Sequence, residues 1–149
     1  MLLHPLRGAL YRSYRERLKM LLQIPEEASD QSVQNLIESG FSASCLKKFC
    51  RITKITPKER NLIISAATLK IRIAAGQHLD SDESLHLFRV AHIYATAHAI
   101  FGDEEKTTRW LSTRKNSLSG KTPTELALTP QGLHQVEEML IQLAEGLAL

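Results

Sequence analysis

Helix-start signals constrain the fold of this chain more than any other feature. Thr56-Pro57-Lys58-Glu59 and Thr122-Pro123-Thr124-Glu125 follow one formula: a capping threonine, proline at the first helical position and glutamate three residues after the cap. Asp80-Ser81-Asp82-Glu83 offers another acidic cap with a carboxylate three residues on. The alternation of β-branched and polar residues that marks strands is missing. The sequence therefore predicts an all-α fold.

Apolar residues recur at helical spacing between these signals. Trp110 and Leu111 are expected to fill the core. In the last helix Leu133, Val136, Leu140, Leu143 and Leu147 form a narrow seam with alternating steps of three and four. We expect helices at about residues 5–22, 30–39, 43–49, 57–62, 66–75, 81–101 and 123–128, and a last helix that starts at Pro130 and ends at Gly146.

Composition places the chain among ordinary globular proteins, with 43% hydrophobic and 23% charged residues. No apolar run is long enough to span a membrane, and the first residues do not resemble a signal peptide. The two cysteines, Cys45 and Cys50, form neither a disulfide framework nor a zinc motif. We therefore expect a cytoplasmic protein.

Charge alternates strongly along the chain, although the net charge is only +3. Residues 1–25 carry +4, 41–76 carry +7, 77–105 carry −5, 106–121 carry +5 and 122–149 carry −4. One interpretation is that these blocks are simply solvated faces of the protein. The other interpretation is that separate faces serve separate partners, with residues 41–76 as the candidate for binding a polyanion.

The segment TPKERNLIISAATLKIRIAAG at 56–76 indicates a helix-turn-helix. Its second helix starts after the cap Ser65, and Leu69 and Ile73 would face inward and hold it at a steep angle to the first helix. In this motif the second helix presents its N-terminal residues to the major groove of DNA. The alternative is a folding or dimerisation scaffold, because Ala66 and Ala67 stand where base-contacting polar side chains are usual. The predicted DNA-binding residues are Ser65, Thr68, Lys70 and Arg72, with Lys47, Lys48, Arg51 and Lys54 adding phosphate contacts.

Residues 96–149 contain an ordered series of motifs: a helix ending in Phe-Gly, a charged stretch with Trp-Leu, then N-x-L-x-G-x-x-P-x-E-L, G-x-x-x-V and a final glycine. This series closely resembles the toxin-binding domain of the Xre/MbcA/ParS antitoxin family, and the upstream part resembles the Xre-like helix-turn-helix that precedes it there. The matching residues are Ala99, Phe101, Gly102, Lys106, Trp110, Leu111, Asn116, Leu118, Gly120, Pro123, Leu126, Gly132, Val136, Leu140 and Gly146.

The resemblance implies a non-enzymatic antitoxin of a type II toxin–antitoxin system. Its partner would be a RES-domain toxin, which resembles ADP-ribosyltransferases and consumes NAD. It further implies a homodimer within a hetero-oligomer, which represses its own operon through operator DNA, usually as the toxin complex. We divide the chain into an N-terminal helix plus helix-turn-helix domain at 1–88 and a toxin-binding domain at 89–149.

In that family the C-terminal domain covers the toxin, and its last residues lie at or in the active-site cleft. Pro123 and Pro130 would fix a short helix as a rigid shelf beside a basic loop. The predicted toxin-binding residues are therefore Arg114, Lys115, Asn116, Leu118, Gly120, Lys121, Leu147, Ala148 and Leu149. Without the resemblance, Leu147 and Leu149 could equally cap the protein's own core.

Other classes of function find less support in the sequence. His86, His92 and His98 are spaced by six residues and cannot share a helix face, so no metal site is predicted. No phosphate-cradling glycine motif occurs, and no cofactor is expected. The basic helix at 5–22 could touch a membrane, but its tyrosines fit packing equally well. The remaining alternative is a stand-alone DNA-binding regulator or adaptor without a toxin.

Overall fold

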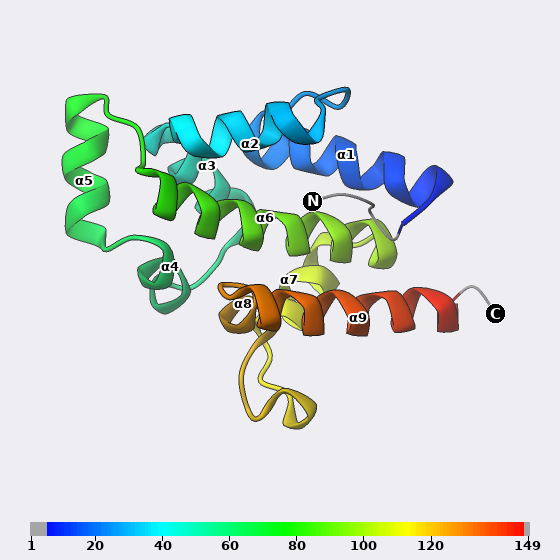
Figure 1. Cartoon of the computed structure of the whole chain (residues 1–149). Helices are drawn as coiled ribbons and strands as arrows, with labels where there is room; N and C mark the ends of the chain where they lie inside the picture. Colours follow the sequence, from blue (N-terminus) through cyan, green and yellow to red (C-terminus); the bar gives the residue numbers. More distant parts are fainter. Residues whose placement is uncertain (1–5, 148–149) are drawn as a thin grey trace.

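The computed structural model describes residues 6–147, and every regular element within that range is helical. The all-α prediction is therefore confirmed. Figure 1 shows helices α1 to α9 packed side by side, with α5 at one edge of the molecule. A short 3-10 helix, η1, lies in the loop before α8. Their bounds are α1 Gly8–Leu22, α2 Asp30–Ser39, α3 Ala43–Thr53, α4 Pro57–Ile63, α5 Ala66–Ala75, α6 Ser81–Phe101, α7 Glu104–Ser112, η1 Asn116–Leu118, α8 Pro123–Leu126 and α9 Pro130–Leu147.

Helix α6 forms the centre of the molecule. It packs against α1, α2, α7 and α9, and Figure 1 shows it running between α2 and α9. A helix covered on all sides has apolar residues around its whole circumference rather than on one stripe. Leu87, Val90, Ala91, Ile93 and Ala95 are accordingly all buried.

The predicted helix starts are present as hydrogen bonds. In α4 the Thr56 hydroxyl accepts from the Glu59 amide at 3.1 Å, and the Glu59 carboxylate accepts from the Thr56 amide at 3.0 Å. The same reciprocal arrangement joins Asp80 and Glu83 at the start of α6. Such caps satisfy the backbone amides that a helix leaves unpaired in its first turn.

Several boundaries differ from the prediction. α1 begins at Gly8, α3 continues to Thr53, and α8 ends at Leu126. The charged stretch after Gly102 forms α7, a helix that is not among those expected from the sequence. Its start is capped by Asp103, whose carboxylate accepts from the Glu105 amide at 3.2 Å.

The expected end of the last helix at Gly146 is wrong, because α9 continues to Leu147. Gly76 and Gly102 do end their helices, and both adopt the left-handed backbone conformation that favours glycine. Gly146 has no positive φ, so it is an ordinary helical residue.

The hydrophobic core is one cluster that extends from Leu6 in front of α1 to Leu140 in α9. The N-terminal helix contributes Tyr14, Leu18 and Leu21 to it, so α1 is packed against α6 and α3. The proposed division after residue 88 falls inside α6, and it stays a prediction.

Candidate functional site

The loop between α7 and α8, residues 113–122, folds back on itself. Its two arms meet at an isolated bridge in which the Lys115 amide donates to the Lys121 carbonyl at 3.1 Å. The Gly120 amide donates to the Lys115 carbonyl at 3.0 Å, and Ser119 and Gly120 take left-handed conformations at the turn. Figure 1 shows this loop projecting away from the helices. The loop is therefore held in one shape by its own backbone.

Aromatic rings and lysines join the loop to the helices. The Lys115 ammonium lies 4.5 Å from the centroid of the Trp110 ring, and the Lys106 ammonium lies 5.4 Å from that of Phe101. The two rings themselves are 5.9 Å apart. Partial burial lowers the pKa of Lys115. Trp110 is half-buried, so the prediction that it fills the core holds fully only for its neighbour Leu111.

A close backbone contact fixes α8 against α9. A Cβ atom at Gly132 would lie 2.0 Å from the carbonyl oxygen of Leu126, so only glycine fits there without a shift. In front of it the Thr129 hydroxyl accepts from the Gly132 amide at 3.1 Å. On the other side of α8, the buried Thr124 hydroxyl donates to the Leu111 carbonyl at 3.1 Å. The two Thr-Pro starts thus produce a short helix that is anchored at both ends.

Most of the predicted toxin-binding residues come together in this loop. Arg114 is exposed and donates to the Gly120 carbonyl at 3.1 Å, with the Glu125 carboxylate 3.9 Å away. Asn116, Gly120 and Lys121 are also exposed, whereas Leu118 is buried and supports the loop from beneath. Leu147 ends α9, but its side chain lies outside the described residues, as do Ala148 and Leu149.

The apolar seam predicted for α9 is shorter than expected. Val136 and Leu140 are buried and Leu133 is half-buried, but Leu143 is 37% exposed. The C-terminal half of α9 therefore presents apolar surface beyond the core.

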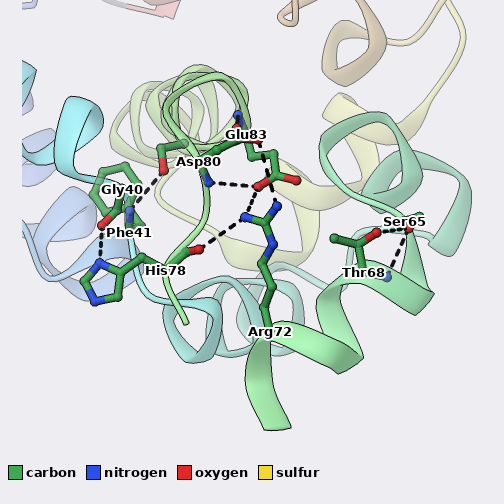
Figure 2. Close-up of polar contacts among 9 residues, drawn as sticks. Gly40, Phe41, Ser65, Thr68, Arg72, His78, Asp80 and Glu83 are labelled. Atoms are coloured by element: carbon green, nitrogen blue, oxygen red, sulfur yellow. Dashed lines mark hydrogen bonds and ion pairs between the residues drawn. The ribbon is translucent and has the colours of Figure 1, made fainter. Parts of the chain in front are cut away.

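The helix-turn-helix consists of α4 and α5, joined at Ile64 and Ser65. Leu69 and Ile73 pack against the core as predicted, although α5 contains no fully buried residue. Figure 2 shows how the far end of α5 is attached to α6: Arg72 forms an ion pair with Glu83 and donates to the His78 carbonyl at 3.1 Å.

The four predicted DNA-binding residues differ in whether their polar groups are already bonded within the protein. The Ser65 hydroxyl donates to that of Thr68 at 2.9 Å and accepts from the Thr68 amide at 3.2 Å, which closes the cap of α5 (Figure 2). Arg72 is engaged with α6, and its side chain is 20% exposed. Lys70 is exposed and forms no ion pair within the described residues.

The sequence does not predict some contacts between residues that are far apart along the chain. The Tyr14 hydroxyl lies 2.7 Å from His92 Nδ1, and His92 Nε2 lies 2.9 Å from a carboxylate oxygen of Glu137. These three side chains connect α1, α6 and α9. Burial is the main cause of the raised pKa of Tyr14. His92 is thus a core residue. Its spacing from the other histidines gave no signal of either partner.

The remaining chemistry-bearing groups form no recognisable centre within the described residues. No group of three metal-binding side chains comes together there. Burial raises the pKa of Cys50 to about 11 and also raises that of Cys45, so both remain thiols near neutrality. None of the described helices combines the length and apolar character needed to cross a bilayer.

Comparison with known proteins finds a family that matches the part of the chain containing loop 113–122. Residues 96–146 match the family described as the antitoxin Xre/MbcA/ParS C-terminal toxin-binding domain. The matched segment runs from the C-terminal end of α6 almost to the end of α9 and includes loop 113–122.

A similar protein supports the same assignment for the whole chain. Antitoxin Xre of Pseudomonas putida (strain KT2440) is 50% identical over 149 residues, which cover 100% of this chain and 94% of that protein. The chain therefore belongs to the Xre family of antitoxins, and its C-terminal part is the family's toxin-binding domain.

Proposed function

We propose that this antitoxin binds a RES-type toxin that consumes NAD, and that it inhibits the toxin by covering its active site. Loop 113–122 and the end of α9 would form the contact surface. The resemblance of residues 96–149 to partners of RES toxins supports the choice of toxin. Inhibition by covering requires no reaction by the antitoxin itself. Such a complex would act in the cytoplasm.

The single observation that carries this proposal is the preformed shape of loop 113–122. Its backbone is closed by hydrogen bonds from the Lys115 amide to the Lys121 carbonyl and from the Gly120 amide to the Lys115 carbonyl. The loop rests on the Trp110 ring and on the buried Leu118. Ordering a flexible loop on binding costs about 1–2 kcal/mol for each residue whose backbone becomes fixed. A loop that is already folded avoids much of this cost, so its exposed basic groups can contribute fully to affinity.

The test is an NAD-consumption assay with the toxin encoded beside this chain. Equimolar antitoxin should abolish NAD loss, and exchanging Arg114 and Lys121 for glutamate should restore much of it. The control is Arg12→Glu, which reverses the charge of an exposed side chain on α1 and should leave inhibition intact. Full toxin activity in the presence of an equimolar amount of folded antitoxin would rule out the proposal.

The C-terminal residues can be tested separately. Deletion of residues 147–149 should weaken inhibition by more than it lowers the midpoint of thermal unfolding. Unchanged inhibition by the folded truncated protein would remove the tail from the contact surface.

DNA binding is a second proposed function, favoured by the net charge of +7 at residues 41–76. A homodimer within the toxin complex would place two helix-turn-helix units on the operator and repress the operon. Changing Lys70 to alanine should lower the slope of log affinity against log salt by about one if it contacts a phosphate. The mass of the complex purified with its toxin would report the stoichiometry. A regulator without a toxin would purify alone.

A further inference from the structure

The outer surface of α5 is unusually apolar for an exposed helix in a basic region. Ala67, Ile71 and Ala74 are exposed and lie four and three residues apart, which places them on one face. Ala66 is also exposed in the first turn, but it lies on another face, because successive residues of a helix are about 100° apart. Ile71 is 65% exposed, more than any other large hydrophobic side chain among the described residues.

The polar groups of α5 are mostly engaged within the protein. Arg72 is held by Glu83 and the His78 carbonyl, and Ser65 and Thr68 bond to each other. Lys70 is the exposed charged side chain that remains on the described helix. Hydrogen bonding to base edges through these side chains is therefore restricted.

The charges on the helices next to α5 favour a polyanion over an apolar partner. Helix α3 packs against α5 and carries exposed Lys47, Arg51 and Lys54, while α4 begins with exposed Lys58. None of these four residues forms an ion pair within residues 6–147. Positive side chains of this kind release counterions from DNA phosphates. An exposed apolar strip on a helix with such basic neighbours fits a DNA groove, in which base edges lie between two rows of phosphates.

We infer that α5 reads operator DNA mainly through the C5-methyl groups of thymine, by apolar contact with Ala67 and Ile71. The methyl group of thymine is the apolar feature that base pairs present in the major groove, and alanine is among the side chains that contact it. The inference rests on the proposed DNA binding and adds to it the chemistry of recognition. Lys70 and the α3 residues then position the helix on phosphates without reading sequence.

The experiment compares thymine with uracil in otherwise identical duplexes. The probes are the DNA immediately upstream of this reading frame and a random duplex of equal length, each made with thymidine or with deoxyuridine. Deoxyuridine pairs in the same way but lacks the methyl group. The full chain is measured alone and with its toxin. For the upstream duplex, affinity should fall by about fourfold for each methyl group that is buried, whereas the random duplex should be unaffected.

Combining a protein variant with the two kinds of duplex tests whether the loss of affinity caused by deoxyuridine depends on α5. Ile71→Ser should weaken binding to the thymidine duplex by about fourfold and leave binding to the deoxyuridine duplex within about twofold. The control is Leu10→Ser, which changes another exposed leucine-sized side chain, 39% exposed on α1. It should change neither affinity. Because Ile71 is largely exposed, its replacement should not prevent folding.

The possible results separate this inference from the function on which it rests. Equal specific affinity for thymidine and deoxyuridine duplexes would overturn the thymine-methyl reading and leave DNA binding in place. Binding to neither duplex, even at low salt, would refute both. If Ile71→Ser changes the mass of the protein in solution but not its DNA affinity, the face is a contact between copies of the chain, and the inference is wrong.

Discussion

The contact between Gly132 and Leu126 gives a sharp test of how α8 is held. In an ordinary helical position, alanine is favoured over glycine by about 1 kcal/mol. At Gly132, however, the new Cβ would lie 2.0 Å from the Leu126 carbonyl oxygen and 2.8 Å from its carbon. Both are backbone atoms, so α8 itself must move. Overpacking of this kind costs about 1–3 kcal/mol.

Because both atoms belong to the backbone, the overpacking cost should lie in the upper part of this range, about 2–3 kcal/mol, so after the helix-propensity gain Gly132→Ala should lower the free energy of unfolding by about 1–2 kcal/mol. For a chain of this size that corresponds to a fall of about 2–8 °C in the midpoint of thermal unfolding. Urea titration followed by the helical circular dichroism signal would measure the change. The same variant should also bind toxin more weakly, because α8 borders loop 113–122.

Gly146 provides the matched control in the same helix. A Cβ added there meets nothing within 4 Å. Gly146→Ala should therefore leave stability unchanged or raise it by up to about 1 kcal/mol. A Gly132→Ala variant that is as stable as the parent protein would refute the close approach of α8 to α9.

Three further predictions follow from contacts between helices and from the burial of a thiol. Tyr14→Phe removes the hydroxyl that bonds to His92 and should cost about 1–2 kcal/mol in urea unfolding, more than Tyr11→Phe. Arg72→Ala breaks the ion pair with Glu83 and should destabilise the fold by about 1 kcal/mol or more, whereas exposed Lys70→Ala should stay within about 0.5 kcal/mol. Because burial raises the pKa of Cys50 from 9.0 to about 11, its thiolate is about a hundredfold scarcer at pH 8 than that of an unshifted thiol; alkylation of folded protein should be correspondingly slow and accelerate as pH rises towards 11, and rapid labelling at pH 8 would contradict this.

Local signals determined which helices the sequence could predict. The caps Thr56, Asp80 and Thr122 act within one turn, so their residues alone indicate where α4, α6 and α8 begin. Helix α7 was missed because its threonines and charges show little apolar periodicity, although Asp103 and the glutamates after it carry a start signal. At Gly146 the reverse happened: a glycine typical of helix ends lies inside the last turn.

The sequence predicted the basic loop at 113–122 but not its internal contacts. Ordered motifs placed loop 113–122, yet they could not show that Leu118 faces inward or that Lys115 covers Trp110. The pairing of Arg72 with Glu83 depends on the turn after Gly76, which brings the end of α5 to the start of α6. Such contacts are set by tertiary geometry, for which residue spacing along one helix carries no information.

The central position of α6 bears on how this antitoxin is removed from a cell. Its first half supports the helix-turn-helix side through Glu83 and Ser84, and its second half supports α7 and α9. A protease that pulls on either end of the chain must unravel the helix on which the other end is packed. We therefore expect no stable truncated remnant, so that the N-terminal helices and the toxin-binding part are lost in a single degradative event.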